Sequence, residues 1–241
     1  MGIRDGGSML IIGGTGPLGL LAIGYALHGE RHPSHIVVTD HHDDKIERAK
    51  QLYADHGDIE ITYINTEGAE DEAKLIRERS GLDGFDDIFV MSAHPDALST
   101  ASALAAEDAC IDFFSGPRSL SFMASVNFYD MHYSRVHYNG ISGGTADDMR
   151  EAVLLVERKI ATPANIVTHA LGPDSVPYAT QHQKEIGGAK IMVYTQKKCP
   201  CLPFPAWRKM IRSAGFFRRQ TASGAKKQKT IFLRTRTILS E

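Results

Sequence analysis

Cysteine and long apolar runs are both scarce in this 241-residue chain, and each scarcity excludes a class of protein. Three cysteines are too few for a disulfide framework, which favours a reducing cytosol over a secreted location. No apolar run approaches the roughly 20 residues that span a bilayer. The first eight residues also lack the apolar core of a secretion signal. We therefore expect a cytoplasmic protein with no membrane partner.

The formal net charge of −2 conceals an asymmetry along the chain. Residues 198–241 carry 11 Lys and Arg against one acid, whereas residues 1–197 carry 28 acids against 16 Lys and Arg. Such a break is typical of a domain boundary, which we place near residue 197. A disordered tail, or non-native sequence appended by a shift of reading frame, is the favoured interpretation. Charge-driven binding of nucleic acid or anionic lipid is less favoured, because no motif or clear helix face emerges.

Short apolar segments alternate with segments of helical spacing through the acidic part of the chain. Strands this apolar indicate a parallel sheet that is covered on both faces. Six of them in order predict an α/β fold, a doubly wound six-stranded sheet of the Rossmann type. The strands are expected at residues 9–13, 34–40, 59–64, 87–91, 110–114 and 135–139, and the helices at residues 18–27, 43–54, 69–80, 95–107 and 146–159.

A glycine-rich turn joins the first expected strand to the first expected helix. Gly14, Gly16 and Gly19 fill the G-x-G-x-x-G pattern, with Thr15, Pro17 and Leu18 between them. In this pattern the first glycine permits a tight turn, the second lets backbone amides approach a pyrophosphate, and the third lets the helix pack against the strand. The free N–H groups at the helix start attract phosphate. The turn therefore predicts dinucleotide binding.

Asp40 ends the second expected strand, 21 residues beyond Gly19. A carboxylate at this place accepts hydrogen bonds from the adenosine ribose hydroxyls and repels a 2′-phosphate, which favours NAD over NADP. Lys45 or a protonated neighbouring histidine could soften that preference. Two alternatives stay open: a glycine turn that only packs, and a mononucleotide or S-adenosylmethionine site on a similar sheet. Ser92 and His94 follow the fourth strand at the same sheet edge and are further candidates for cofactor binding. His94 is a candidate for contact with the adenosine ribose, and a solvated loop residue is an equal alternative for it.

These motifs resemble the cofactor-binding half of the zinc-dependent medium-chain dehydrogenase/reductase family, which includes alcohol and sorbitol dehydrogenases. The resemblance covers residues 8–197, and the polyol-type, sorbose-1-phosphate reductase-like branch is the nearest in pattern. Residues 13–23 are similar to the family's nucleotide turn, residues 160–169 to the strand that returns to the catalytic domain, and residues 188–194 to its closing strand.

The resemblance implies hydride transfer between nicotinamide and a secondary alcohol or ketone of a polyol or sugar phosphate. It also implies homo-oligomers, and nicotinamide contacts after the fifth and sixth strands. Simple chain turning is an equal alternative for these last residues. They are Ser115, Gly116, Ile141, Ser142 and Gly143.

The resemblance also exposes an expected gap, because family members carry a zinc-binding catalytic domain before the glycine turn. Only eight residues precede Met9, and Cys110, Cys199 and Cys201 lack the family's ligand spacing. We therefore expect no metal site, no catalytic residue and no turnover by this chain alone. A non-catalytic NAD-binding module or regulatory subunit is the alternative. The parts expected are a leader (1–8), the dinucleotide-binding domain (9–160), a returning segment of the catalytic domain (161–197) and the basic tail (198–241).

Two further patterns favour ordinary structural roles. Six histidines fall within the first 56 residues, and we interpret them as solvated loop residues rather than metal ligands. Tyr129 and Tyr133 lack a lysine four residues further on, since those positions hold Tyr133 and His137. The catalytic pair of a short-chain dehydrogenase is therefore absent.

Overall fold

The structure, a computed structural model, describes residues 3–186, 190–196 and 199–213. The chain forms two compact units, one ending at Ala161 and the other beginning at Thr162. Within the described residues, no helix is both long enough and apolar enough to cross a membrane.

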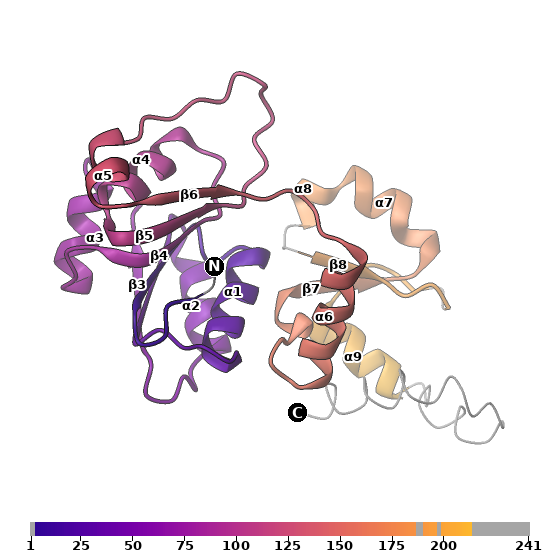
Figure 1. Cartoon of the computed structure of the whole chain (residues 1–241). Coiled ribbons are helices and arrows are strands. Elements are labelled where there is room, and N and C mark those ends of the chain that lie inside the picture. Colours follow the sequence, from indigo (N-terminus) through magenta and orange to yellow (C-terminus); the bar gives the residue numbers. More distant parts are fainter. Residues whose placement is uncertain (1–2, 187–189, 197–198, 214–241) are drawn as a thin grey trace. The chain divides into compact units, whose positions relative to one another are not determined.

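The first unit is built on a six-stranded sheet in which every paired strand is parallel, with the order β3-β2-β1-β4-β5-β6 (Figure 1). The order reverses between β1 and β4, which is where ligands bind in open sheets of this kind. This is the expected doubly wound α/β fold. Its strands are β1 (Ser8–Ile12), β2 (His35–Asp40), β3 (Glu60–Asn65), β4 (Phe85–Val90), β5 (Ala105–Phe113) and β6 (His137–Gly140).

The first four helices follow the strands and cover the sheet on both faces. Leu10, Val37 and Ile88 share a core cluster with Ile76 and Ala101, which come from α3 and α4. Alternate residues of the same strands face the other side, where the Tyr53 hydroxyl at the end of α2 donates to the Leu20 carbonyl of α1 at 2.5 Å. The helices are α1 (Pro17–His28), α2 (Asp43–Leu52), α3 (Glu72–Ser80), α4 (Pro95–Ala103), α5 (Phe128–Tyr133) and α6 (Ala146–Glu157).

The strand β5 differs from its expected bounds. The pattern predicts a helix up to residue 107, but α4 ends at Ala103 and Ala105 already pairs with Phe85 of β4. The pairing register then shifts between Phe85 and Asp87, and Asp108 takes a left-handed conformation with φ 61°. The first residues of this irregular strand are alanines, which favour helices, so the sequence pattern predicts a helix where the structure has a strand. The short helix α5 was also not expected.

The leader before β1 is bound to the sheet edge where the strands begin. Ile3 is buried, and the Arg4 backbone N–H donates to the Asp87 carboxylate at 2.7 Å. The Arg4 guanidinium pairs with Asp86 at 2.5 Å and with Asp108 at 3.3 Å. Burial raises the pKa of the Asp87 carboxyl above its ordinary value, and the Arg4 N–H opposes that rise only in part.

The second unit has a small sheet with the order β8-β7-β9. Strand β7 pairs with β8 in parallel and with β9 in antiparallel fashion. Trp207 of α9 is buried beside Ala170 and stacks on Phe204, with ring centroids 5.9 Å apart. The elements are two 3-10 turns, η1 (Pro163–Ile166) and η2 (Pro173–Ser175), with β7 (Val167–Leu171), α7 (Val176–Gln181), α8 (Gln183–Ile186), β8 (Lys190–Val193), β9 (Leu202–Pro203) and α9 (Phe204–Ser213).

The second unit also differs from the expected tail. The charge break predicts a separate tail from residue 198, yet residues 199–213 supply β9 and α9 to the sheet of this unit. Phe204, Trp207 and Met210 recur every third residue and make an apolar helix face that the basic composition conceals. The rest of the expected tail, residues 214–241, lies outside the described residues.

Candidate functional site

In the glycine turn between β1 and α1, the structural roles of the individual glycines differ from those that the pattern predicts. Gly13, not Gly14, takes the left-handed conformation that makes the turn tight, with φ 72°. A Cβ at Gly14 would lie 2.7 Å from Val38 Cγ1, and a Cβ at Gly19 would lie 2.2 Å from the Gly14 carbonyl oxygen. Gly14 and Gly19 are therefore required by close packing, which agrees with the expected role of Gly19 alone.

The first turn of α1 leaves its backbone donors open. Gly16 is the N-cap and has no side chain to satisfy them, and Pro17 at the first helical position has no N–H of its own. A Cβ at Gly16 would meet only the Gly13 carbonyl oxygen, at 3.7 Å. Leu18 beside it is exposed. The helix start thus offers an unobstructed, positively polarised surface that suits an anion.

Asp40 is the last residue of β2 and lies beside this turn. The turn is joined to β2 by the Gly14 N–H, which donates to the Thr39 carbonyl at 2.9 Å. The buried Thr15 hydroxyl donates to Asp40 Oδ2. The His41 backbone N–H donates to Asp40 Oδ1 at 2.8 Å. The carboxylate is therefore held at the mouth of the turn by one side chain and one backbone group.

A cleft of about 430 Å³ opens at this edge of the sheet. Of the residues predicted from the sequence, it brings together Gly16, Asp40, Ser92 and His94. His94 is exposed and pairs with Asp96 at 3.4 Å. The other residues that line the cleft are Ile12, Gly13, Thr39, His41, His42, Lys45, Thr66, Glu72, Met91, Asp96 and Ala97.

Thr66, Glu72 and Asp96 are among the lining residues that the sequence reasoning missed. Glu72 begins α3, and its carboxylate accepts from His41 Nε2 at 3.2 Å across the cleft. The signal for Glu72 and Thr66 was present, because both lie in the connection after β3, at the edge where the carboxyl ends of the strands meet. Acidic residues at a helix start are common, so the pattern does not single out Glu72.

The residues predicted after β5 and β6 do not line this cleft. Ser115 and Gly116 follow β5, and Ile141, Ser142 and Gly143 follow β6. Ile141 is 55% exposed, and Gly143 has a left-handed φ of 72° that suits a turn. Their positions at the carboxyl ends of strands agree with the pattern, and their contact with nicotinamide stays a prediction.

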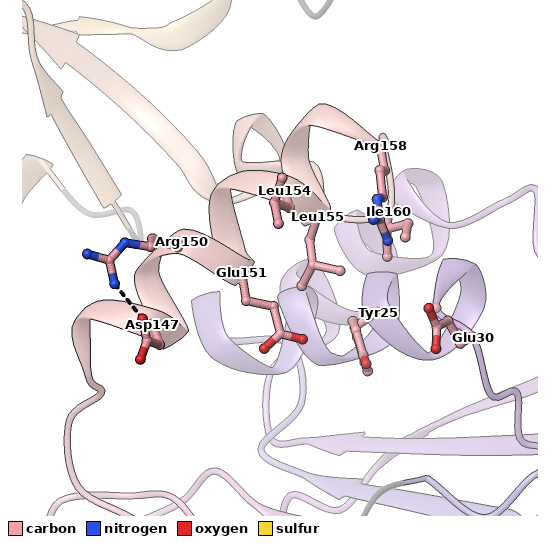
Figure 2. Close-up of a pocket in the computed structure, with 10 residues that line it drawn as sticks. Tyr25, Glu30, Asp147, Arg150, Glu151, Leu154, Leu155, Arg158 and Ile160 are labelled. Atoms are coloured by element: carbon pink, nitrogen blue, oxygen red, sulfur yellow. Dashed lines mark hydrogen bonds and ion pairs between the residues drawn. The ribbon is translucent and has the colours of Figure 1, made fainter.

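A second hollow of about 430 Å³ lies in the same unit, between the end of α1 and the side of α6 (Figure 2). Tyr25 and Glu30 face Glu151 and Leu155 across it. No side chain of α6 is buried, and Arg150 is engaged with Asp147 of the same helix. The hollow is therefore bordered by charged side chains of both signs together with Tyr25, Leu154, Leu155 and Ile160, and nothing in it indicates a ligand.

Metal-binding geometry is absent from the part of the chain that the structure describes, where no three or more His, Cys, Asp or Glu side chains could hold one ion. Cys110 in β5 accepts from the Asn139 side chain at 3.0 Å, and burial raises the pKa of its thiol. Burial and the neighbouring Cys199 raise the pKa of the Cys201 thiol. Raised values disfavour the thiolates that bind metals.

A sequence profile of the zinc-binding dehydrogenases matches residues 17–158. The chain is 45% identical over 203 residues to L-sorbose 1-phosphate reductase of Klebsiella pneumoniae, covering 84% of this chain and 49% of that protein. It is 34% identical over 221 residues to mannitol-1-phosphate 5-dehydrogenase of Aliivibrio fischeri, covering 90% and 52%.

Solved structures show the same fold. One is a short chain alcohol dehydrogenase of Escherichia coli CFT073 complexed with NADH, with a TM-score of 0.61 and 21% identity over 83% of this chain and 53% of that one. The chain thus spans about half the length of the curated relatives and of this structure.

Proposed function

Because the chain belongs to the zinc-binding dehydrogenase family, we propose that its first unit is the site where an oxidoreductase binds a nicotinamide dinucleotide. The observation that carries the proposal is the cleft in which Asp40 lies beside the open N-terminus of α1. The backbone N–H groups of the first turn of α1 receive the pyrophosphate, with Gly16 leaving the approach clear. When bound, the nicotinamide carries the hydride that the reaction transfers.

The cleft favours NAD over NADP. Asp40 accepts from the two hydroxyls of an unphosphorylated ribose and repels a 2′-phosphate. His42 and Lys45 also line the cleft, so some positive charge lies near the carboxylate. Neither residue pairs with Asp40 in the described contacts, whereas Thr15 and the His41 N–H do.

The substrate class of the whole enzyme is proposed to be a polyol or sugar phosphate. The support is the names of the two relatives, a reductase of L-sorbose 1-phosphate and a dehydrogenase of mannitol 1-phosphate. The second unit is assigned to the part of the enzyme that returns toward the catalytic half. No zinc-dependent step is assigned to the described residues, since they hold no group of metal ligands.

Calorimetric titration of the chain with NADH and NADPH tests the proposal. We expect saturable binding of NADH that is tighter than binding of NADPH. Asp40→Ala replaces the ribose acceptor and removes a charge-assisted hydrogen bond. It is expected to weaken the binding of NADH by about 1.5–3 kcal/mol, with little effect on the binding of NADPH. Equal affinity for both dinucleotides in the unmutated chain would overturn the preference, and binding of neither would overturn the function.

A further inference from the structure

Thr15 has a contact that the glycine pattern does not account for. It is the residue between Gly14 and Gly16, and it is 4% exposed although it lies in a surface turn. Its hydroxyl donates to Asp40 Oδ2, on the neighbouring strand. An ionised carboxylate only accepts hydrogen bonds, so the hydroxyl proton must point at Asp40. The turn is fixed against the same strand by the Gly14 N–H and the Thr39 carbonyl, which lie 2.9 Å apart.

The capacity of the Asp40 carboxylate explains what this contact does. A carboxylate offers about four lone-pair sites. Thr15 fills one on Oδ2, and the His41 N–H fills one on Oδ1, at 2.8 Å. One site is left on each oxygen, and a ribose diol has one donor for each. The rotation of the carboxylate is restrained before the ligand arrives, so binding does not have to order it.

We infer that Thr15 is a positioning residue that sets the preference for an unphosphorylated ribose by orienting the Asp40 carboxylate. The inference rests on the proposed function and adds to it a second determinant of cofactor choice. Without the hydroxyl, the carboxylate keeps its charge but loses the orientation that presents one acceptor to each ribose hydroxyl. The affinity for NADH, which has the ribose diol, then falls. The affinity for NADPH, whose 2′-phosphate gains nothing from those acceptors, changes little.

The test compares Thr15→Val, which keeps the shape and removes the hydroxyl, with Thr15→Ser, which keeps the hydroxyl. Both are made in the full chain, and NADH and NADPH are titrated by calorimetry. We expect Thr15→Val to lower the affinity for NADH about tenfold, which is the scale of one charge-assisted hydrogen bond. The affinity for NADPH is expected to change less than about twofold. Thr15→Ser is expected to keep the NADH to NADPH ratio within about twofold of the unmutated chain.

A double-mutant cycle separates this role from a general effect on the turn. In an Asp40→Ala background, Thr15→Val should change NADH affinity less than about twofold, because the partner of the hydroxyl is already gone. An unchanged cofactor ratio in Thr15→Val, an equal loss for both cofactors, or the same loss in the Asp40→Ala background would each overturn the inference and leave the proposed function standing. Failure of the unmutated chain to bind either dinucleotide would overturn both.

Discussion

Gly16 is the one glycine of the turn that neither close packing nor a left-handed φ requires. A Cβ there has ordinary space, whereas a Cβ at Gly14 or Gly19 would lie within 2.7 Å of a neighbouring atom. We therefore expect Gly16→Val to abolish measurable NADH binding without unfolding the protein, because the added side chain stands where the pyrophosphate approaches. Calorimetry gives the binding and thermal melting gives the fold. The NADH affinity of Gly16→Ala should fall between that of the unmutated chain and that of Gly16→Val. Normal affinity in Gly16→Val would show that the glycines serve packing alone.

The position of a candidate-site residue was predictable where it follows from the place of that residue in the turn. Gly16 and Asp40 could be placed because a strand, a turn and a helix recur at known spacing. Gly13 could not be distinguished from Gly14, because the pattern gives the spacing of the glycines and not their backbone angles, and only the structure shows the left-handed φ at Gly13. The contact between Thr15 and Asp40 was also beyond reach, since the pattern leaves the residue between the glycines free.

At the scale of elements, the buried strands β1, β2 and β4 lay close to the expected segments, because continuous apolar runs leave few alternatives. Strand β5 and helix α9 did not. Strand β5 begins with alanines and acids that suit a helix, and pairing with β4 decides its structure. Helix α9 has its apolar residues at every third position within a basic stretch, where charge obscured them.

Helix α3 carries Glu72 to the cleft, and its start is fixed by a cap. Asp71 Oδ1 accepts from the Lys74 N–H at 2.9 Å, which satisfies one donor of the first turn. We expect Asp71→Ala to lower the free energy of unfolding by about 1 kcal/mol, the usual loss for such a cap. Urea denaturation measures it. Exposed Glu70→Ala, one residue before the cap, is the matched control, and equal losses in the two variants would contradict the capping role.

At the scale of the whole molecule, Asp87 makes stability depend on pH. Its pKa in the folded state is raised by burial, so folding disfavours the ionised form. The contribution of Asp87 to stability is therefore greatest below the ordinary carboxyl range, and it is lost as the pH rises through the folded-state pKa. Asp87→Asn keeps an acceptor for the Arg4 N–H without the charge. We expect it to melt at a higher temperature than the unmutated chain at pH 7.

The gain in Asp87→Asn should shrink as the pH falls, because the native carboxyl is then neutral as well. Thermal melting across pH 4–7 measures the difference. Exposed Asp55→Asn serves as the control and is expected to leave the melting temperature unchanged at every pH. A gain that is the same at all pH values would mean that the buried charge is not its source.

The division into two units gives the single tryptophan a particular use. Trp207 is the only tryptophan of the chain, and it is buried in the second unit, whereas the cleft lies entirely in the first. The fluorescence of the indole ring of Trp207 therefore reports on the second unit alone. Reduced nicotinamide absorbs in the range where indole emits, so a dinucleotide in the cleft would be an energy acceptor. The efficiency of energy transfer from Trp207 to the bound dinucleotide would measure the distance between the two units in solution.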